Sequence, residues 1–191
     1  MPHHEPAGAT IRRLWPSDRA AIETHFRSLD QDSRFNRFMG AVSAAGAGAY
    51  AARSLQAEGL VFGAFVDGTL RGVGEVRPTA AGGLGSDAEA AFTVERDFRC
   101  RGLGTALAGR LSHASRNAGV KRLHVRCLSH NHPMRGLALK LGADLAVSGR
   151  ELHATLALAP PTLFSLWSEG MESLLDVALA ALAPRRAAAP A

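Results

Sequence analysis

The sequence predicts a mixed α/β (α+β) domain in which helices flank a central sheet. Three observations predict it. Short apolar runs of strand length alternate with segments of helical period, and a hairpin turn joins two of the early runs. The apolar content of 47% is enough for one sizeable core. A chain of 191 residues has the size of a single domain.

The first half of the chain is predicted to hold four strands and two helices. Pro16-Ser17-Asp18 opens the first helix, and Asp32 with Ser33 can cap the second. Residues 40–52 are rich in Ala and Gly and predict no definite element. Asp67-Gly68 is a hairpin signal between two strands. The expected strands are residues 9–14, 60–66, 69–77 and 88–94.

The second half alternates helices and strands. A helix from Gly102 to Ala118 ends at Gly119, and a helix that starts at Pro133 ends at Gly142. The expected strands are residues 123–128, 144–147 and 152–158, followed by a last helix over 162–182. These elements predict a disordered N-terminus (1–8), one domain (9–158), an appended C-terminal helix (159–183) and a disordered tail (184–191).

The last helix is apolar over much of its surface, with apolar residues at 163, 167, 171, 174, 175, 178 and 182. Such a helix needs cover. It is expected to pack on its own domain, and a dimer contact is the alternative. Both a monomer and a homodimer therefore remain open.

Composition argues against several classes of protein. No apolar run reaches about 18 residues, so no membrane partner is expected, and the first residues do not resemble a secretion signal. Two cysteines, Cys100 and Cys127, are too few for a disulfide framework, which favours a reducing, cytoplasmic setting. The net charge of +5 comes from scattered arginines, so no nucleic-acid partner is expected. The histidine spacing matches no standard site, so we predict no metal.

A glycine turn between a strand and a helix carries the chemistry. It is Arg99-Cys100-Arg101-Gly102-Leu103-Gly104. Glycines let the backbone approach a ligand, and the start of a helix offers free N–H groups and a positive dipole end. Two arginines add charge, so the turn suits a phosphate or pyrophosphate. By itself the pattern fits a plain strand–turn–helix connection equally well.

Two stretches at the right separation resemble the GNAT superfamily of acetyltransferases. Residues 94–104 resemble its acetyl-CoA-binding signature, and residues 131–143, from Asn131 to Ala143, resemble its second signature. The resemblance covers roughly residues 10–158. More loosely, residues 13–18 and 26–38 resemble the start of the GNAT domain of bacterial protein lysine acetyltransferases.

The resemblance implies a GNAT-like three-layer fold with a central splayed mixed sheet flanked by helices. It also implies acetyl-CoA as cosubstrate and transfer of the acetyl group to a primary amine. Backbone amides of residues 100–105 would hold the pyrophosphate, and the backbones of Phe92 and Val94 would pair with the pantetheine arm. The implied cofactor-binding residues are Phe92, Val94, Arg99, Cys100, Arg101, Gly102, Leu103, Gly104, Thr105, Asn131 and Met134.

An acceptor amine must lose a proton before it attacks, and a carboxylate usually accepts that proton. Glu89 is favoured because it begins the strand that leads into the turn, in a context similar to related protein acetyltransferases. Glu75 lies where other GNAT members place a base, and a mechanism that uses neither is the third alternative. Many members also use a tyrosine as general acid, but residues 135–140 hold none and the single tyrosine is Tyr50.

The leading hypothesis is an amine N-acetyltransferase, with protein lysines as one class of acceptor. Acetylation of a small amine is the second hypothesis. A non-catalytic acyl-CoA sensor with the GNAT fold is the third, kept open by the missing tyrosine. The loops that would select the acceptor, about 30–58 and 78–87, carry no readable signature, so the acceptor is not named.

Overall fold

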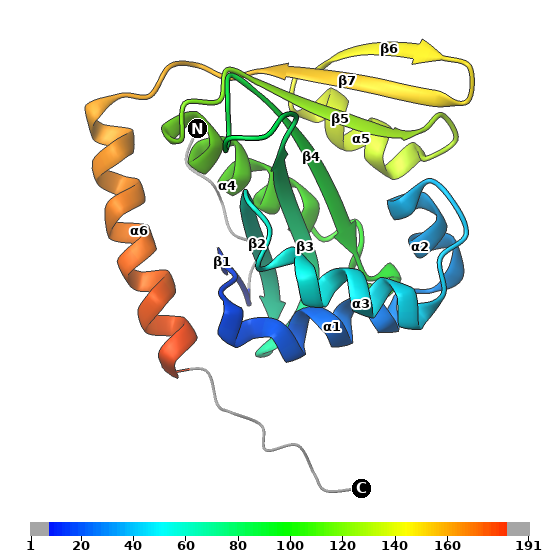
Figure 1. The fold of residues 1–191 in the computed structure, drawn as a ribbon, viewed down its shortest axis with the longest axis horizontal. Helices are drawn as coiled ribbons and strands as arrows, with labels where there is room; N and C mark the ends of the chain where they lie inside the picture. Colours follow the sequence, from blue (N-terminus) through cyan, green and yellow to red (C-terminus); the bar gives the residue numbers. More distant parts are fainter. Residues whose placement is uncertain (1–7, 183–191) are drawn as a thin grey trace, which may run out of the picture.

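The computed structural model describes residues 8–182, which form a seven-stranded mixed sheet with helices on both faces (Figure 1). The strands are β1 (Ala9–Arg13), β2 (Leu60–Val66), β3 (Thr69–Pro78), β4 (Asp87–Val94), β5 (Arg122–Leu128), β6 (Asp144–Ser148) and β7 (Glu151–Ala157). The α-helices are α1 (Arg19–Ser28), α2 (Gln31–Phe38), α3 (Ala44–Ser54), α4 (Leu103–Asn117), α5 (His132–Lys140) and α6 (Leu163–Leu182). The expected disordered segments lie outside the described residues, except for Gly8.

The sheet opens between its two parallel strands. The strand order is β1-β2-β3-β4-β5-β7-β6, and β4 with β5 is the parallel pair. Their pairing runs from Asp87↔Arg122 to Glu89↔His124 and then stops, although the strands continue to Val94 and Leu128. This confirms the expected splayed mixed sheet. We call the space between the two strands beyond Glu89 the β4–β5 split.

Different helices cover the two faces of the sheet. On one face α1 and α3 bury Phe26 and Ala51 against Val73 of β3. On the other face α4 packs over β2 and β3, where Gly74 leaves room for it, because a Cβ there would lie 2.4 Å from Leu111 Cδ1. At the split, α2 packs over β4 and β5 on the α1–α3 face, while α5 packs with the core on the α4 face.

One helix begins earlier than the sequence predicts, and another helix was not predicted. The N-cap of α2 is Asp30, whose carboxylate accepts a hydrogen bond from the Ser33 amide (3.0 Å), so this helix starts earlier than a cap at Asp32 or Ser33 implies. Residues 44–54 form α3, capped by Ser43. Helix α3 carries few large side chains, and small residues such as Ala47 and Ala51 fit it closely against α1. Tertiary packing, which local periodicity does not report, therefore stabilises it.

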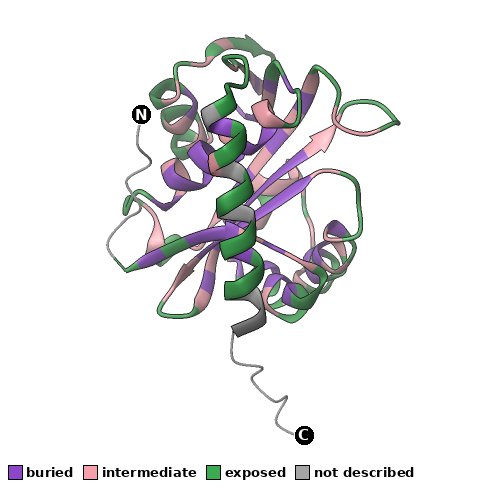
Figure 2. Ribbon diagram, turned by 90° about the vertical axis from the view of Figure 1, so that its left-hand side faces the viewer, coloured by how far each residue is buried: buried purple, intermediate pink, exposed green. Residues whose placement is uncertain are grey.

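Helix α6 docks on the domain through polar contacts. The carboxylate of Asp176 accepts hydrogen bonds from the Arg13 amide (2.9 Å) and from Arg110 Nη2 (3.3 Å), while Ser165 bonds to Asn117 (2.8 Å). Many residues of α6 are exposed in the single chain (Figure 2), and cover of its apolar residues by a dimer partner stays a prediction. Its exposed apolar residues are Leu163, Leu166, Trp167, Met171, Leu174, Leu175, Val177 and Leu179.

The contacts of Asp176 predict how α6 can be loosened. Asp176→Asn keeps the size of the side chain but removes the charge opposite the buried Arg110. We expect the free energy of unfolding to fall by about 1–3 kcal/mol, because hydrogen bonds to charged groups contribute that much. Limited proteolysis should cut α6 faster in this variant. Asp144→Asn, at an exposed position on β6, is the control, and equal cleavage of α6 in both variants would contradict the prediction.

Candidate active site

A row of polar side chains crosses the sheet where the split begins. Glu89 pairs with His124, and His124 pairs with Thr155, so the three lie side by side on β4, β5 and β7. They line an open cavity of about 230 Å³ together with Arg126 and His153. The sheet therefore places a carboxylate, two imidazoles and a guanidinium at the mouth of the split.

Glu89 is the accessible carboxylate of this cavity. Its side chain is 42% exposed, and Oε1 accepts a hydrogen bond from Arg126 Nε at 3.2 Å. An ion pair this exposed contributes about 0–1 kcal/mol, so an approaching ammonium can compete with Arg126 at small cost. The neighbouring Asp87 is held more firmly, because hydrogen bonds from Arg122 and His124 keep the pKa of Asp87 well below its usual value.

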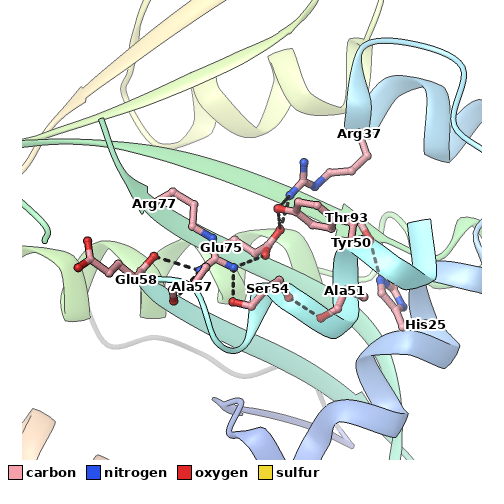
Figure 3. A network of polar contacts seen from close by, with 10 residues as sticks. All are labelled: His25, Arg37, Tyr50, Ala51, Ser54, Ala57, Glu58, Glu75, Arg77 and Thr93. Carbon is pink, nitrogen blue, oxygen red and sulfur yellow. Dashed lines mark hydrogen bonds and ion pairs between the residues drawn. The ribbon is translucent and has the colours of Figure 1, made fainter. Parts of the chain in front are cut away.

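Glu75, the second candidate base, is enclosed. It is 1% exposed, Oε2 accepts from Arg37 of α2 and Tyr50 of α3, and Oε1 accepts from Arg77 Nη2 at 2.7 Å (Figure 3). Burial works to raise the pKa of Glu75, but the charges of Arg37 and Arg77 outweigh it and hold that pKa below the usual value. The geometry therefore keeps Glu75 ionised, with both oxygens occupied by donors from three elements.

Tyr50 belongs to the same cluster. Its hydroxyl donates to Glu75 Oε2 at 3.0 Å and accepts from Arg37 Nη2 at 3.0 Å. Burial, and then the nearby charge of Glu75, raise the pKa of Tyr50. Sequence reasoning missed Arg37 and Tyr50 as parts of the site. Arg37 lies in a helix that the sequence predicts, and Tyr50 lies in the Ala- and Gly-rich segment 40–52, but no local pattern brings the two together.

The glycine turn has the backbone of a phosphate cradle. Cys100 and Gly102 both adopt left-handed conformations, with φ of +58° and +84°, and Gly102 is the N-cap of α4. The first amides of a helix have no partner within the helix, so those of Leu103, Gly104 and Thr105 are available to a ligand. A Cβ at Gly104 would meet nothing closer than Leu137 at 3.8 Å, so space remains beside the turn. The turn fits a pyrophosphate.

The two arginines of the turn are used differently. Arg99 donates to the carbonyl of Val94 (3.0 Å) and to the hydroxyl of Ser33 (2.5 Å), which ties the turn to α2. Arg101 is exposed and lies over the Phe98 ring at 5.0 Å. Arg101 therefore keeps its charge at the surface, where a phosphate could reach it, while Arg99 is occupied by structural contacts.

The remaining predicted residues surround the split on the α4 face. Asn131 caps α5, and its side chain accepts from the Met134 amide at 3.3 Å. Met134 and Val94 pack against the main core, and Phe92 lines a small apolar cavity of about 20 Å³ next to it. Because the β4–β5 pairing stops at Glu89, the edge of β4 from Ala90 to Val94 faces the split. An extended ligand could pair with this edge.

The model of the acetyltransferase (GNAT) family matches residues 20–143. The chain belongs to this family. The chain is 43% identical over 56 residues to the acetyltransferase Pat of Mycolicibacterium smegmatis, a match that covers 29% of this chain and 17% of Pat. The matched stretch thus spans about a sixth of that curated relative.

Solved structures share the fold of this chain. The GNAT domain of S. lividans PAT has a TM-score of 0.67 at 18% identity, over 78% of this chain and 90% of that one. The Salmonella typhimurium protein yncA, solved with acetyl-CoA, has a TM-score of 0.59 at 20% identity, over 81% of this chain and 96% of that one.

These comparisons confirm the predicted family and the fold class. Among residues 8–182, no helix has the length and apolarity needed to span a membrane. The roles of individual site residues remain predictions.

Proposed function

We propose that this acetyltransferase moves the acetyl group of acetyl-CoA directly onto a primary amine, with Glu89 as the general base. One observation carries the proposal. The pairing of β4 with β5 ends at the row of Glu89 and His124, so an open strand edge begins beside an accessible carboxylate. The edge suits an extended thioester, and the carboxylate suits an ammonium.

The residues present divide the work of binding. The amides of residues 103–105 and the exposed Arg101 would hold the pyrophosphate, with Gly102 providing the turn. The edge of β4 at Phe92 and Val94 would orient the pantetheine arm, and acetyl-CoA supplies the activated acetyl group. Glu89 would then take the proton from the ammonium, so that a neutral nitrogen faces the acetyl carbon.

The acceptor is a primary amine, and a protein lysine is the first candidate. The matches to Pat and to the GNAT domain of PAT support this choice. The cavity of about 230 Å³ is large enough for a lysine side chain or a small amine, so acetylation of a small molecule is the second candidate. The exposed Cys100 and the buried Cys127 are both free thiols, which fits a cytoplasmic enzyme.

Thiol release from acetyl-CoA tests the proposal. The assay would compare lysine-containing peptides, free amino acids and polyamines, with mass spectrometry to locate the acetyl group on nitrogen. Acetylation of at least one amine supports the enzyme. Tight acetyl-CoA binding without turnover on any amine would instead favour the non-catalytic sensor.

A substitution at Gly102 tests the phosphate cradle. Gly102→Asp places a side chain where φ is +84° and brings a negative charge to the pyrophosphate. We expect acetyl-CoA affinity, measured by calorimetry, to fall at least about tenfold, or ~1.4 kcal/mol. Gly149→Asp, at another left-handed glycine in the β6–β7 turn, is the control for backbone strain. A folded Gly102→Asp variant with unchanged affinity would remove the turn from the site.

A further inference from the structure

A buried guanidinium crosses the sheet next to the split. Arg37 belongs to α2, which packs over β4 and β5, yet its Nη2 contacts Glu75 on β3 (Figure 3). Adjacent strands lie about 4.8 Å apart, so the Arg37 side chain must pass above β4 to reach its partner. Glu75 pairs with Ala91, and the crossing therefore lies at Ala91.

Ala91 marks an opening in the covered surface of β4. It is partly exposed, whereas Thr93, the next residue of β4 on the same face, is buried. It lies two residues beyond Glu89 on the same face of the strand, a distance of about 7 Å. The stem of Arg37 thus passes close to the start of the split, one step along β4 from the proposed base.

The cluster around Arg37 carries more positive than negative charge. Glu75 is one carboxylate shared by Arg37 and Arg77. Arg77 is also engaged elsewhere, because its other bonds go to backbone carbonyls at the end of α3 and just beyond it. Tyr50 is neutral, so the cluster has a net charge of about +1 by formal charges. Burial works to lower the pKa of Arg37, but the charge of Glu75 outweighs it and raises that pKa, so the guanidinium stays charged.

One donor of this guanidinium is unused. In the part of the chain that the structure describes, Arg37 Nε is buried without a hydrogen-bond partner. Leaving a buried donor unsatisfied costs about 1–3 kcal/mol, so native proteins usually give such groups a partner. The Nε atom lies on the stem between α2 and the guanidinium, which crosses β4 to reach Glu75.

We propose that Arg37 is a catalytic residue that stabilises negative charge on the CoA sulfur as the thioester is cleaved. The inference rests on the proposed function. The amine nitrogen forms a bond to the acetyl carbon, the C–S bond breaks, and its electron pair goes to sulfur. One ammonium proton has gone to Glu89, and the second leaves the nitrogen to solvent. An arginine gives up no proton, so Arg37 acts by its fixed charge.

Arg37 would replace the tyrosine that many family members use as general acid, which residues 135–140 lack. A positive charge placed before the reaction stabilises a thiolate without proton transfer, and a dry surrounding strengthens the effect. The other charged or titratable groups at this place are Glu75 and Arg77 from β3, Tyr50 from α3 and, further along β4, Glu89. In this group the single negative charge close to Arg37 is that of Glu75, which already has two cations.

The affinities for CoA and acetyl-CoA test the proposal without an acceptor. A free thiol ionises near pH 8.5, and a nearby cation shifts its ionisation to lower pH. Calorimetry at pH 7 and pH 9 should show that CoA affinity rises about tenfold more than acetyl-CoA affinity. Acetyl-CoA has no free thiol, so its affinity corrects for all other ionisations in the site.

Three variants separate the charge of Arg37 from the integrity of its cluster. Arg37→Gln removes the charge but leaves Glu75 with Arg77 and Tyr50, and we expect the tenfold difference to disappear while acetyl-CoA affinity stays within about twofold. Tyr50→Phe removes one bond of the same cluster without a change of charge and should behave like the wild type. Arg37→Lys keeps the positive charge and should retain more than a threefold difference.

The inference is overturned if the affinities for CoA and acetyl-CoA depend equally on pH in the wild type. It is also overturned if the tenfold difference survives in Arg37→Gln. If Arg37→Gln does not fold, Arg37→Lys is the test, and loss of the difference in this charged variant overturns the role of the charge. If the wild type binds neither CoA nor acetyl-CoA, the proposed function is wrong, and the inference about Arg37 is then also wrong.

Discussion

Glu89→Gln is expected to lower the rate of acetyl transfer by about 10²–10⁴-fold, the usual contribution of a general base. Glutamine keeps the shape of the side chain and can still accept a bond from Arg126, but it cannot take a proton from the ammonium. Acetyl-CoA affinity should stay within about twofold, because Glu89 lies on the cavity side of the split, away from the glycine turn. Steady-state thiol release and calorimetry measure the two quantities.

Glu151→Gln is the matched control for this variant. It removes the same charge from an exposed glutamate beside His153, which lines the same cavity, and we expect more than half of the wild-type rate. A folded Glu89→Gln enzyme with the full rate would show that Glu89 is not the base. If Glu75→Gln were inactive while Glu89→Gln stayed active, the base would lie on β3.

Glu75→Gln is expected to destabilise the fold by about 3–5 kcal/mol, the cost of removing one partner from a buried ion pair. The carboxylate is 1% exposed and joins β3 to α2 and α3, so its loss leaves Arg37 and Arg77 buried against a neutral amide. Denaturant unfolding at pH 7 measures the change. Tyr50→Phe, which removes one hydrogen bond of the cluster, should cost only about 0.5–1.5 kcal/mol.

The same group predicts how stability depends on pH. The pKa of Glu75 is lower in the folded protein than in the unfolded chain, where a glutamate titrates near pH 4.3 at about its usual value. Its contribution is therefore complete above about pH 4.3 and is lost as the pH falls through the lower, folded pKa. Glu75→Gln should flatten the fall in stability over that acidic range. A variant as stable as the wild type, with an unchanged acid profile, would contradict the ion-pair account.

Local sequence features determined much of the framework. The glycine turn was predictable because Gly102 must adopt a left-handed conformation, and the helix after it has a clear apolar stripe from Leu103 to Leu111. The hairpin at Asp67-Gly68 and the cap at Asn131 were predictable for the same reason, since each depends on residues within a few positions. Helix α3 was not predictable, because its small residues show no period and only packing on α1 specifies it.

The sequence by itself determined the family, the position of the glycine turn and the two candidate carboxylates, because each of these lies in a short contiguous motif. Only the tertiary structure separated Glu75 from Glu89. Both alternate onto the same face of the sheet, but Glu75 meets Arg37 and Tyr50, which α2 and α3 bring from 38 and 25 residues away. Glu89 stays accessible because β5 turns away just beyond it. Long-range contacts set burial and charge, and these decide which carboxylate is free to take a proton.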